Sequence, residues 1–444
     1  MSSTYSIKNI WKIAYPIILG SLAQDIITVV DTMFIGRLGT QALGASALAG
    51  ILYLSIVMMG MGFGVGVQII IARRLGEKNY KAVSSTFIHS VLILVSIALF
   101  MFVVGRLVID QAISLLVSSD GVAKLCNDFL GVRIWGFFAA FINIAFRSFY
   151  IGIARTKIIS ITTIVMAVVN VVLDYFLIFG VGIFPKMGIV GAAIASIVAE
   201  LIALIVFVIY TKRSSINAEY NLFSKFSFSS VLSNQIIKIS YPAMFQNFLA
   251  FFSWFIFFLF VEGMGEGPLA ISNIIRSIYI ILMLPIMGFA SASNSLISYC
   301  IGQNNIRMIS VVVKRSLLLA MLGIVVIVSL GLIYPDAIIR LFTNDNNLVK
   351  ETIPTFYVVS GSTFVLAFGL IMFQAMLGTG ATQVGLFIEG VTIVVYLLGS
   401  YFISKNYSEI HYVWSMEFIY GLMLGVGSFI YLKYGKWRTL KTKV

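Results

Sequence analysis

Long apolar segments separated by short polar connections follow one another along almost the whole chain. A helix needs about 20 residues to cross the hydrocarbon core of a bilayer, so segments of this length predict membrane-spanning helices. Twelve spans are expected, over residues 10–36, 44–72, 83–109, 128–153, 158–182, 188–211, 236–262, 269–299, 312–335, 353–377, 383–404 and 411–434. The pattern therefore predicts an all-α integral membrane protein with twelve transmembrane helices.

The longest polar connection runs over 212–232, between the sixth and the seventh predicted span. It divides the chain into an N-lobe, residues 1–211, and a C-lobe, residues 233–444, with six predicted spans in each. We interpret 212–232 as the cytoplasmic linker between the two lobes.

The two halves repeat each other. A shift of 226 residues places Tyr15-Pro16 on Tyr241-Pro242 and Gly62-Phe63 on Gly288-Phe289. Because each half has an even number of spans, both copies insert the same way up, as in transporters built from parallel repeats. We therefore expect two pseudo-symmetric six-helix lobes around a central cleft that holds the substrate path.

Composition agrees with a membrane protein, since only 11% of the residues are charged, against about a quarter in a typical soluble domain. The net charge of +13 would favour nucleic acid as a partner in a soluble protein. Here most Lys and Arg residues fall in connections on one side of the predicted membrane, which orients the chain. The bias predicts both termini in the cytoplasm, and since it accounts for the basic residues, we expect no nucleic-acid partner. We further expect the protein in the inner (plasma) membrane of a bacterium.

Few residues suit catalysis or a bound cofactor. The two cysteines, Cys126 and Cys300, are far apart and lack metal-ligand spacing, and the chain has only two histidines. No paired histidines, acidic loop cluster or nucleophile motif suggests a membrane enzyme. We therefore expect a protein that is not an enzyme and that has no cofactor.

The first span is the most unusual, because it carries Gln24, Asp25 and Asp31. A carboxylate at membrane depth is costly, so it usually faces a partner or a water-filled cavity. Seven helical residues turn roughly 700°, which puts Gln24 and Asp31 within about 20° of each other, with Asp25 about 100° from Gln24. One face of this helix is therefore predicted to belong to an ion or substrate pathway.

Two further spans of the first half carry polar pairs at i,i+4 spacing, which places each pair on one helix face. Asn170 and Asp174 lie in the fifth span, and Ser196 and Glu200 lie in the sixth. Their oxygens suit a hard cation such as Na⁺, and an acid pair can equally hold a proton. Helix-packing contacts are the alternative for Asn and Ser.

Charged residues elsewhere in the spans have structural interpretations of at least equal weight. Arg133, in the fourth span, is expected to neutralise first-half acids or to extend to the membrane boundary. In the second half, Arg276 is expected to form a structural ion pair with Glu389 or Glu417. For Arg276, Glu389 and Glu417, a direct role in the cation mechanism remains the alternative.

Several motifs together resemble the multidrug and toxic compound extrusion (MATE) family. They are Pro16, the run VDTMFIGRLGTQALGASALAG over Val30–Gly50, NVVLDYFLIFG over Asn170–Gly180, and IGQNN over Ile301–Asn305. The resemblance covers essentially the whole chain. It implies two six-helix lobes around a V-shaped cleft and export of cationic or amphipathic drugs, driven by Na⁺ or H⁺.

The resemblance also implies a cation site in the N-lobe. The family's cation cluster corresponds to Asp31, Asn170 and Asp174, which would hold Na⁺ in a sodium-coupled member. The hydroxyl position corresponds to Ser196 and the first-helix glutamine to Gln24. A C-lobe acid pair used by part of the family is missing here, because the stretches around Phe251 and Leu366 contain no acid. Coupling is therefore expected in the N-lobe.

We thus predict a monomeric cation/drug antiporter that works by alternating access. The alternative within transport is a flippase for a lipid-linked saccharide from the related superfamily. Such a flippase would be expected to show more charged residues along its cavity than this sequence does. The coupling ion, Na⁺ or H⁺, stays open at this stage.

Overall fold

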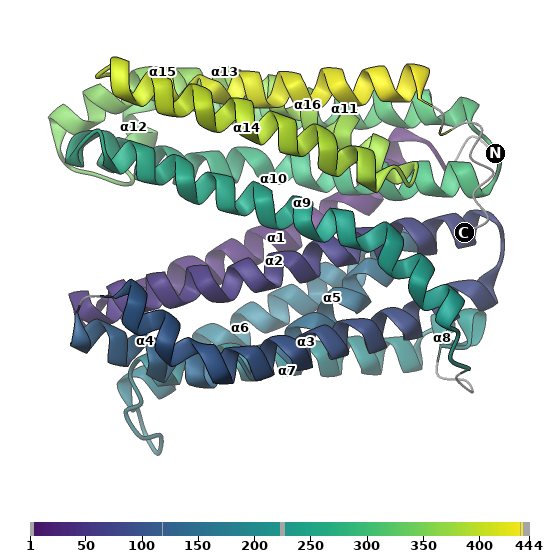
Figure 1. Ribbon diagram of the computed structural model, residues 1–444, viewed down its shortest axis with the longest axis horizontal. Helices are drawn as coiled ribbons and strands as arrows, with labels where there is room; N and C mark the ends of the chain where they lie inside the picture. The colour runs from purple at the N-terminus through teal and green to yellow at the C-terminus, as the bar shows by residue number, and fades with distance from the viewer. Residues whose placement is uncertain (1–3, 118, 223–226, 436, 438–444) are drawn as a thin grey trace. The chain divides into compact units, whose positions relative to one another are not determined.

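The computed structural model describes residues 4–117, 119–222, 227–435 and 437, and every regular element in these residues is a helix (Figure 1). In chain order the helices are α1 (Ile7–Gly36), α2 (Thr40–Gly76), α3 (Tyr80–Leu116), α4 (Asp120–Arg133), α5 (Gly136–Gly152), α6 (Lys157–Phe179), α7 (Ile189–Arg213), α8 (Ser215–Tyr220), α9 (Ser230–Glu262), α10 (Glu266–Gly302), α11 (Arg307–Ile333), α12 (Pro335–Ile339), α13 (Asn346–Gly378), α14 (Thr382–Asn406), α15 (Ile410–Trp414) and α16 (Met416–Tyr434).

Membrane-spanning length and hydropathy are found in 11 helical segments of the described residues, one of which joins α15 to α16. A twelfth span is formed if α4 and α5 are taken together across their bend of 52°. The prediction of an all-helical membrane protein with twelve spans is therefore confirmed.

The fourth span differs from the straight helix expected over 128–153. α4 begins at Asp120, and the chain breaks after Arg133 before α5 begins at Gly136. At the break the amide of Phe137 donates to the carbonyl of Ile134 at 3.1 Å, which is a tighter turn than an α-helix makes. Hydropathy alone could not locate this bend, because apolar residues continue through it.

Two compact units make up the chain. The N-unit consists of Leu19–Arg74 and Lys78–Ser240, and the C-unit consists of Met1–Ile18, Leu75–Glu77 and Tyr241–Val444.

The predicted linker, 212–232, contains the end of α7, the short helix α8 and the start of α9, while residues 223–226 lie outside the described residues. Within the N-unit, His89 of α3 accepts a hydrogen bond from the amide of Ser229 at 2.9 Å, just before α9 begins. The predicted linker is therefore tied to the N-unit at this point.

In the N-unit, α6 lies between α1 and α7. Small residues allow α7 to approach α6 closely, since a Cβ atom on Gly191 would lie 2.7 Å from the carbonyl of Leu177. On the other side, Phe34 of α1 packs against Phe179 of α6, with ring centroids 5.6 Å apart. Polar residues on α1, α6 and α7 are thereby brought together inside the unit.

Aromatic side chains dominate the core of the C-unit. Trp414 is fully buried and donates its indole N–H to Ser272 of α10 at 2.9 Å. Phe257 of α9 packs edge-on against Trp414 and stacks on Tyr396 of α14. This core surrounds the buried acids of the C-unit that are described below.

Candidate functional site

The centre of the candidate site is a pair of aspartates in the N-unit, Asp31 on α1 and Asp174 on α6. Their carboxyl groups lie within hydrogen-bonding reach of each other, so one proton can join them. Asp174 is completely buried, and one oxygen of Asp31 is buried as well. Two carboxylates this close in a medium of low dielectric cannot both stay charged without a proton or a cation.

The oxygens of this pair have few partners. Among the described residues, both carboxylate oxygens of Asp174, Oδ1 of Asp31 and Oδ1 of Asn170 are buried without a hydrogen-bond donor. The amide nitrogen of Asn170 donates to Oγ of Ser196 on α7, at 3.4 Å, so its oxygen is the atom left without a partner. Buried polar atoms usually have partners, so a group of four such oxygens indicates a site for a ligand.

These oxygens fit a small monovalent cation. Carboxylate and carbonyl oxygens are the ligands that hard cations prefer. The described residues contain no group of three or more His, Cys, Asp or Glu side chains arranged for a metal ion, so the site offers two acids at most. With two carboxyl groups and two neutral oxygens, the cluster can hold Na⁺, or it can hold a proton on the pair. We call Asp31, Asn170, Asp174 and Ser196 the cation cluster.

Gln24 and Asp25, the other polar residues of α1, are placed differently. The side chain of Gln24 is exposed and that of Asp25 is half-buried. Among the described residues, no hydrogen bond or ion pair joins the side chain of Gln24 to the cation cluster. Gln24 and Asp31 share a helix face, but seven residues separate them by about 10 Å along the axis, which is too far for one ion to bridge.

Glu200, one turn after Ser196 on α7, has a partner of its own. Arg133 donates two hydrogen bonds to the Glu200 carboxylate, at 2.5 and 3.1 Å. The expectation that Arg133 neutralises an acid of the first half is therefore confirmed. Because Glu200 follows Ser196 by one helical turn, the ion pair lies next to the cation cluster, and Arg133 acts electrostatically on Asp31.

The expected ion pair between Arg276 and a C-unit glutamate is wrong. Glu417 accepts hydrogen bonds from the hydroxyl groups of Tyr279, at 3.0 Å, and Tyr396, at 2.9 Å. Glu389 accepts a hydrogen bond from the hydroxyl group of Tyr420.

The side chain of Arg276 lies instead on an exposed face of α10, with its guanidinium carbon 5.2 Å from the centre of the Phe258 ring. Both glutamates are 2% exposed and point into the core, so an arginine on the outer face does not meet them. Tyrosine hydroxyls could replace the arginine because they also donate hydrogen bonds to carboxylates.

Comparison with known proteins identifies the family. A family model described as MatE matches the chain twice, over residues 16–176 and 242–402. The chain belongs to the MATE family. Both ends of the second match lie 226 residues after those of the first, which is the offset at which the sequence repeats. As a MATE protein, the chain is a multi-pass membrane transporter and not an enzyme.

Relatives of this MATE chain cover most of its length. It is 28% identical over 403 residues to a protein named multidrug export protein MepA from Staphylococcus saprophyticus, covering 87% of this chain and 85% of the relative. It is 24% identical over 406 residues to a protein named probable multidrug resistance protein NorM from Thermotoga maritima, covering 91% and 86%. A crystal structure described as MATE in complex with MaL6 matches with a TM-score of 0.89 at 17% identity, over 100% of both chains, which shows a shared fold.

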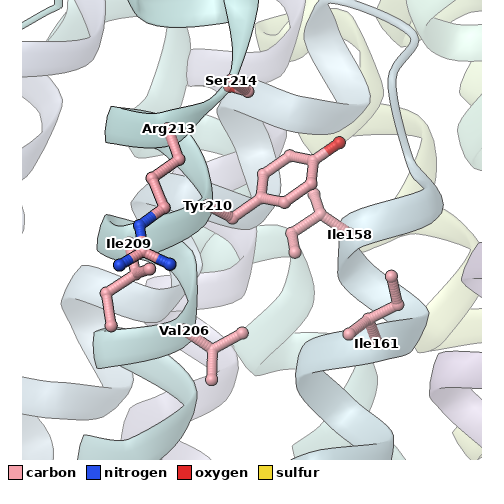
Figure 2. Close-up of a pocket in the computed structure, with 7 residues that line it drawn as sticks. All are labelled: Ile158, Ile161, Val206, Ile209, Tyr210, Arg213 and Ser214. Carbon is pink, nitrogen blue, oxygen red and sulfur yellow. The ribbon is translucent and has the colours of Figure 1, made fainter.

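A surface hollow of about 430 Å³ in this MATE chain lies apart from the cation cluster. Figure 2 shows Ile158 and Ile161 of α6 across from Val206 and Tyr210 of α7, with Arg213 at the end of the helix. The hollow is open and almost entirely apolar, and no residue of the cluster lines it. The hollow is a shallow apolar groove between two membrane helices, α6 and α7, and it is not part of the candidate functional site.

Proposed function

We propose that this protein is a multidrug exporter that couples the outward movement of cationic or amphipathic compounds to the inward movement of Na⁺ or H⁺. It works by alternating access in the inner (plasma) membrane of a bacterium, with both termini in the cytoplasm. The relatives named as multidrug export and resistance proteins support the substrate class.

One observation carries the coupling part of the proposal. Asp31 and Asp174 are carboxyl groups at membrane depth, and three of their four oxygens are buried without a donor among the described residues. The free energy of such a pair changes strongly when a cation or proton binds. A bound cation shifts a conformational equilibrium only by its difference in affinity for the two states, and this cluster provides a site where that difference can arise.

The experiment is efflux of ethidium from proteoliposomes under a Na⁺ gradient and, separately, under a pH gradient. Asp31→Asn should fold and still bind drug, but it should lose gradient-driven efflux, and Asp174→Asn should have a similar defect. Asp25→Asn, away from the cluster, serves as the matched control and should retain nearly full efflux. Efflux that needs ATP and neither gradient would overturn the proposal, as would full activity of Asp31→Asn.

A further inference from the structure

Arg133 is held more tightly than a simple ion pair requires. It is the last residue of α4, at the bend between α4 and α5, and both of its terminal nitrogens donate to the carboxylate of Glu200. Its guanidinium carbon lies 3.9 Å from the centre of the Tyr53 ring on α2. Tyr53 in turn stacks on Phe137, with ring centroids 4.9 Å apart and planes 1° apart. Three helices besides its own therefore contribute to the position of this charge.

Gly136 completes the cradle around Arg133. A Cβ atom at this position would lie 2.2 Å from Nη1 of Arg133 and 2.9 Å from Oε2 of Glu200. Any larger residue would push the guanidinium away from the carboxylate. The glycine at the start of α5 therefore lets the ion pair sit against the backbone at the bend.

The position of this cation matters because its partner Glu200 follows Ser196 of the cation cluster by one helical turn on α7, which puts the ion pair next to the cluster. Arg133 acts electrostatically on Asp31, while the cation cluster itself contains no basic residue. The charges of Arg133 and Glu200 cancel, so the aspartate pair keeps its need for a cation. This cancellation depends on both residues, since removing either member of the ion pair leaves one uncompensated charge next to the cation cluster.

We propose that the ion pair of Arg133 and Glu200 sets the affinity of the aspartate pair for its coupling cation, with Arg133 as a fixed positive charge next to the cation cluster. Both are positioning residues that act on the bound cation through the field at Asp31. This inference rests on the proposed function, because it assumes that the aspartate pair binds a monovalent cation.

The two partners of the ion pair have opposite expected effects. Arg133→Gln removes a positive charge and leaves Glu200 unpaired, so Na⁺ or H⁺ should bind more tightly. Glu200→Gln leaves Arg133 unpaired beside Asp31, so the same cation should bind more weakly. A neighbouring charge changes the protonation equilibrium of a carboxyl group by about tenfold or more at close range, so each variant should shift the midpoint by up to about tenfold. If the ion pair were purely structural, Arg133→Gln and Glu200→Gln would instead have the same effect, which is a lower stability of the folded protein.

The test measures how the melting temperature of the purified protein depends on cation concentration. Na⁺ is varied at constant ionic strength and pH, and in a second series pH is varied without Na⁺, so the two series distinguish the two cations. The cation concentration at which half of the stabilisation is reached, called the midpoint, reports affinity for the cation. It does so even where a variant melts at a lower temperature overall. The double variant Arg133→Gln/Glu200→Gln should restore the wild-type midpoint, and Arg133→Lys, which keeps the charge, should stay close to it.

Another ion pair of the N-unit provides the matched control. Arg155 and Glu219 are 2.6 Å apart, and their side chains are 42% and 33% exposed, so solvent screens them and neutralising either should leave the midpoint unchanged. If a single variant at 133 or 200 does not fold, the exchanged pair Arg133→Glu/Glu200→Arg decides. The exchanged pair keeps two opposite charges but puts the negative charge at position 133. The cation should therefore bind more tightly, and the midpoint should move to a lower cation concentration.

The outcomes separate this inference from the proposed function. If wild type shows cation-dependent stabilisation that Asp174→Asn abolishes, but the variants at 133 and 200 shift the midpoint in the same direction or not at all, the inference alone is overturned. An unchanged midpoint in the exchanged pair overturns it as well. If wild type shows no stabilisation by either cation, the proposed cation site and this inference fall together.

Discussion

Buried acids occur in both units of the molecule, but their surroundings differ. In the N-unit, Asp31 and Asp174 face each other, with three of their four oxygens buried and without a donor among the described residues. In the C-unit, Glu417 and Glu389 are buried about as fully as Asp174, yet tyrosine hydroxyls donate to both of them. Burial alone therefore does not separate the two pairs of acids, whereas the presence of hydrogen-bond donors does.

The difference has a physical cause. A buried carboxyl group that accepts hydrogen bonds has replaced its water contacts and stabilises one conformation. A buried carboxyl group without donors is unfavourable until a ligand arrives, so it belongs to a site that fills and empties. We therefore propose that the N-unit pair serves coupling and that the C-unit pair is structural, and the following substitutions test this contrast.

The largest effect is expected at the N-unit pair. Asp174→Asn removes an acid whose oxygens have no donor, so the folded state should lose little stability or gain some, while gradient-driven efflux falls to background. Efflux and melting temperature of the same preparation check both parts. A variant that unfolds, or one that transports normally, would remove the distinction between the two units.

The next largest effect is expected at Glu417, and on stability instead of transport. Glu417→Leu leaves the hydroxyls of Tyr279 and Tyr396 without their acceptor inside the core. Each unsatisfied buried group costs roughly 1–3 kcal/mol, so the melting temperature should fall clearly. Efflux per folded molecule should stay near wild type. Loss of efflux with unchanged stability would instead make Glu417 part of the transport mechanism.

A smaller loss of stability is expected for Tyr420→Phe. This substitution keeps the ring and removes only the hydroxyl that donates to Glu389, so a single hydrogen bond is lost at a cost of about 1–3 kcal/mol. Thermal denaturation alongside Glu417→Leu gives the comparison. A loss as large as that of Glu417→Leu would show that Glu389 depends on this donor more than the geometry indicates.

The smallest effect is expected for Arg276→Gln. Its guanidinium group lies over Phe258 on an exposed face, and a cation–π contact of this kind contributes about 0.5–1 kcal/mol. The melting temperature and efflux should both stay close to wild type. A large loss of stability would instead support the ion pair between Arg276 and a C-unit glutamate that the sequence suggested.

Helix periodicity predicted much of the fold and of the candidate site. The i,i+4 spacing placed Asn170 with Asp174 on one face of α6 and Ser196 with Glu200 on one face of α7, whereas the grouping of these faces with Asp31 was implied by the family resemblance. The same reasoning was insufficient for Gln24, since angular agreement around a helix gives no information about the distance along it.

Partner choice between helices was harder to predict. Arg276 was assigned to a glutamate because both are charged, but the sequence does not show that three tyrosines from neighbouring helices supply the donors. The α4–α5 bend and the cradle of Arg133 were also hidden, since they depend on Gly136 and Tyr53 meeting through tertiary contacts. Such contacts are set by packing between helices, which the pattern within one helix does not encode.

Direct cation binding tests the central claim that the Asp31–Asp174 pair is the coupling site. Equilibrium dialysis with radioactive Na⁺ at fixed pH, with proton uptake recorded on the same preparation, would be carried out on wild type, Asp174→Asn and Glu417→Gln. We expect wild type to bind one of these cations, Asp174→Asn to lose that binding, and Glu417→Gln to retain it. Binding that persists in Asp174→Asn, or that disappears in Glu417→Gln, would contradict the account.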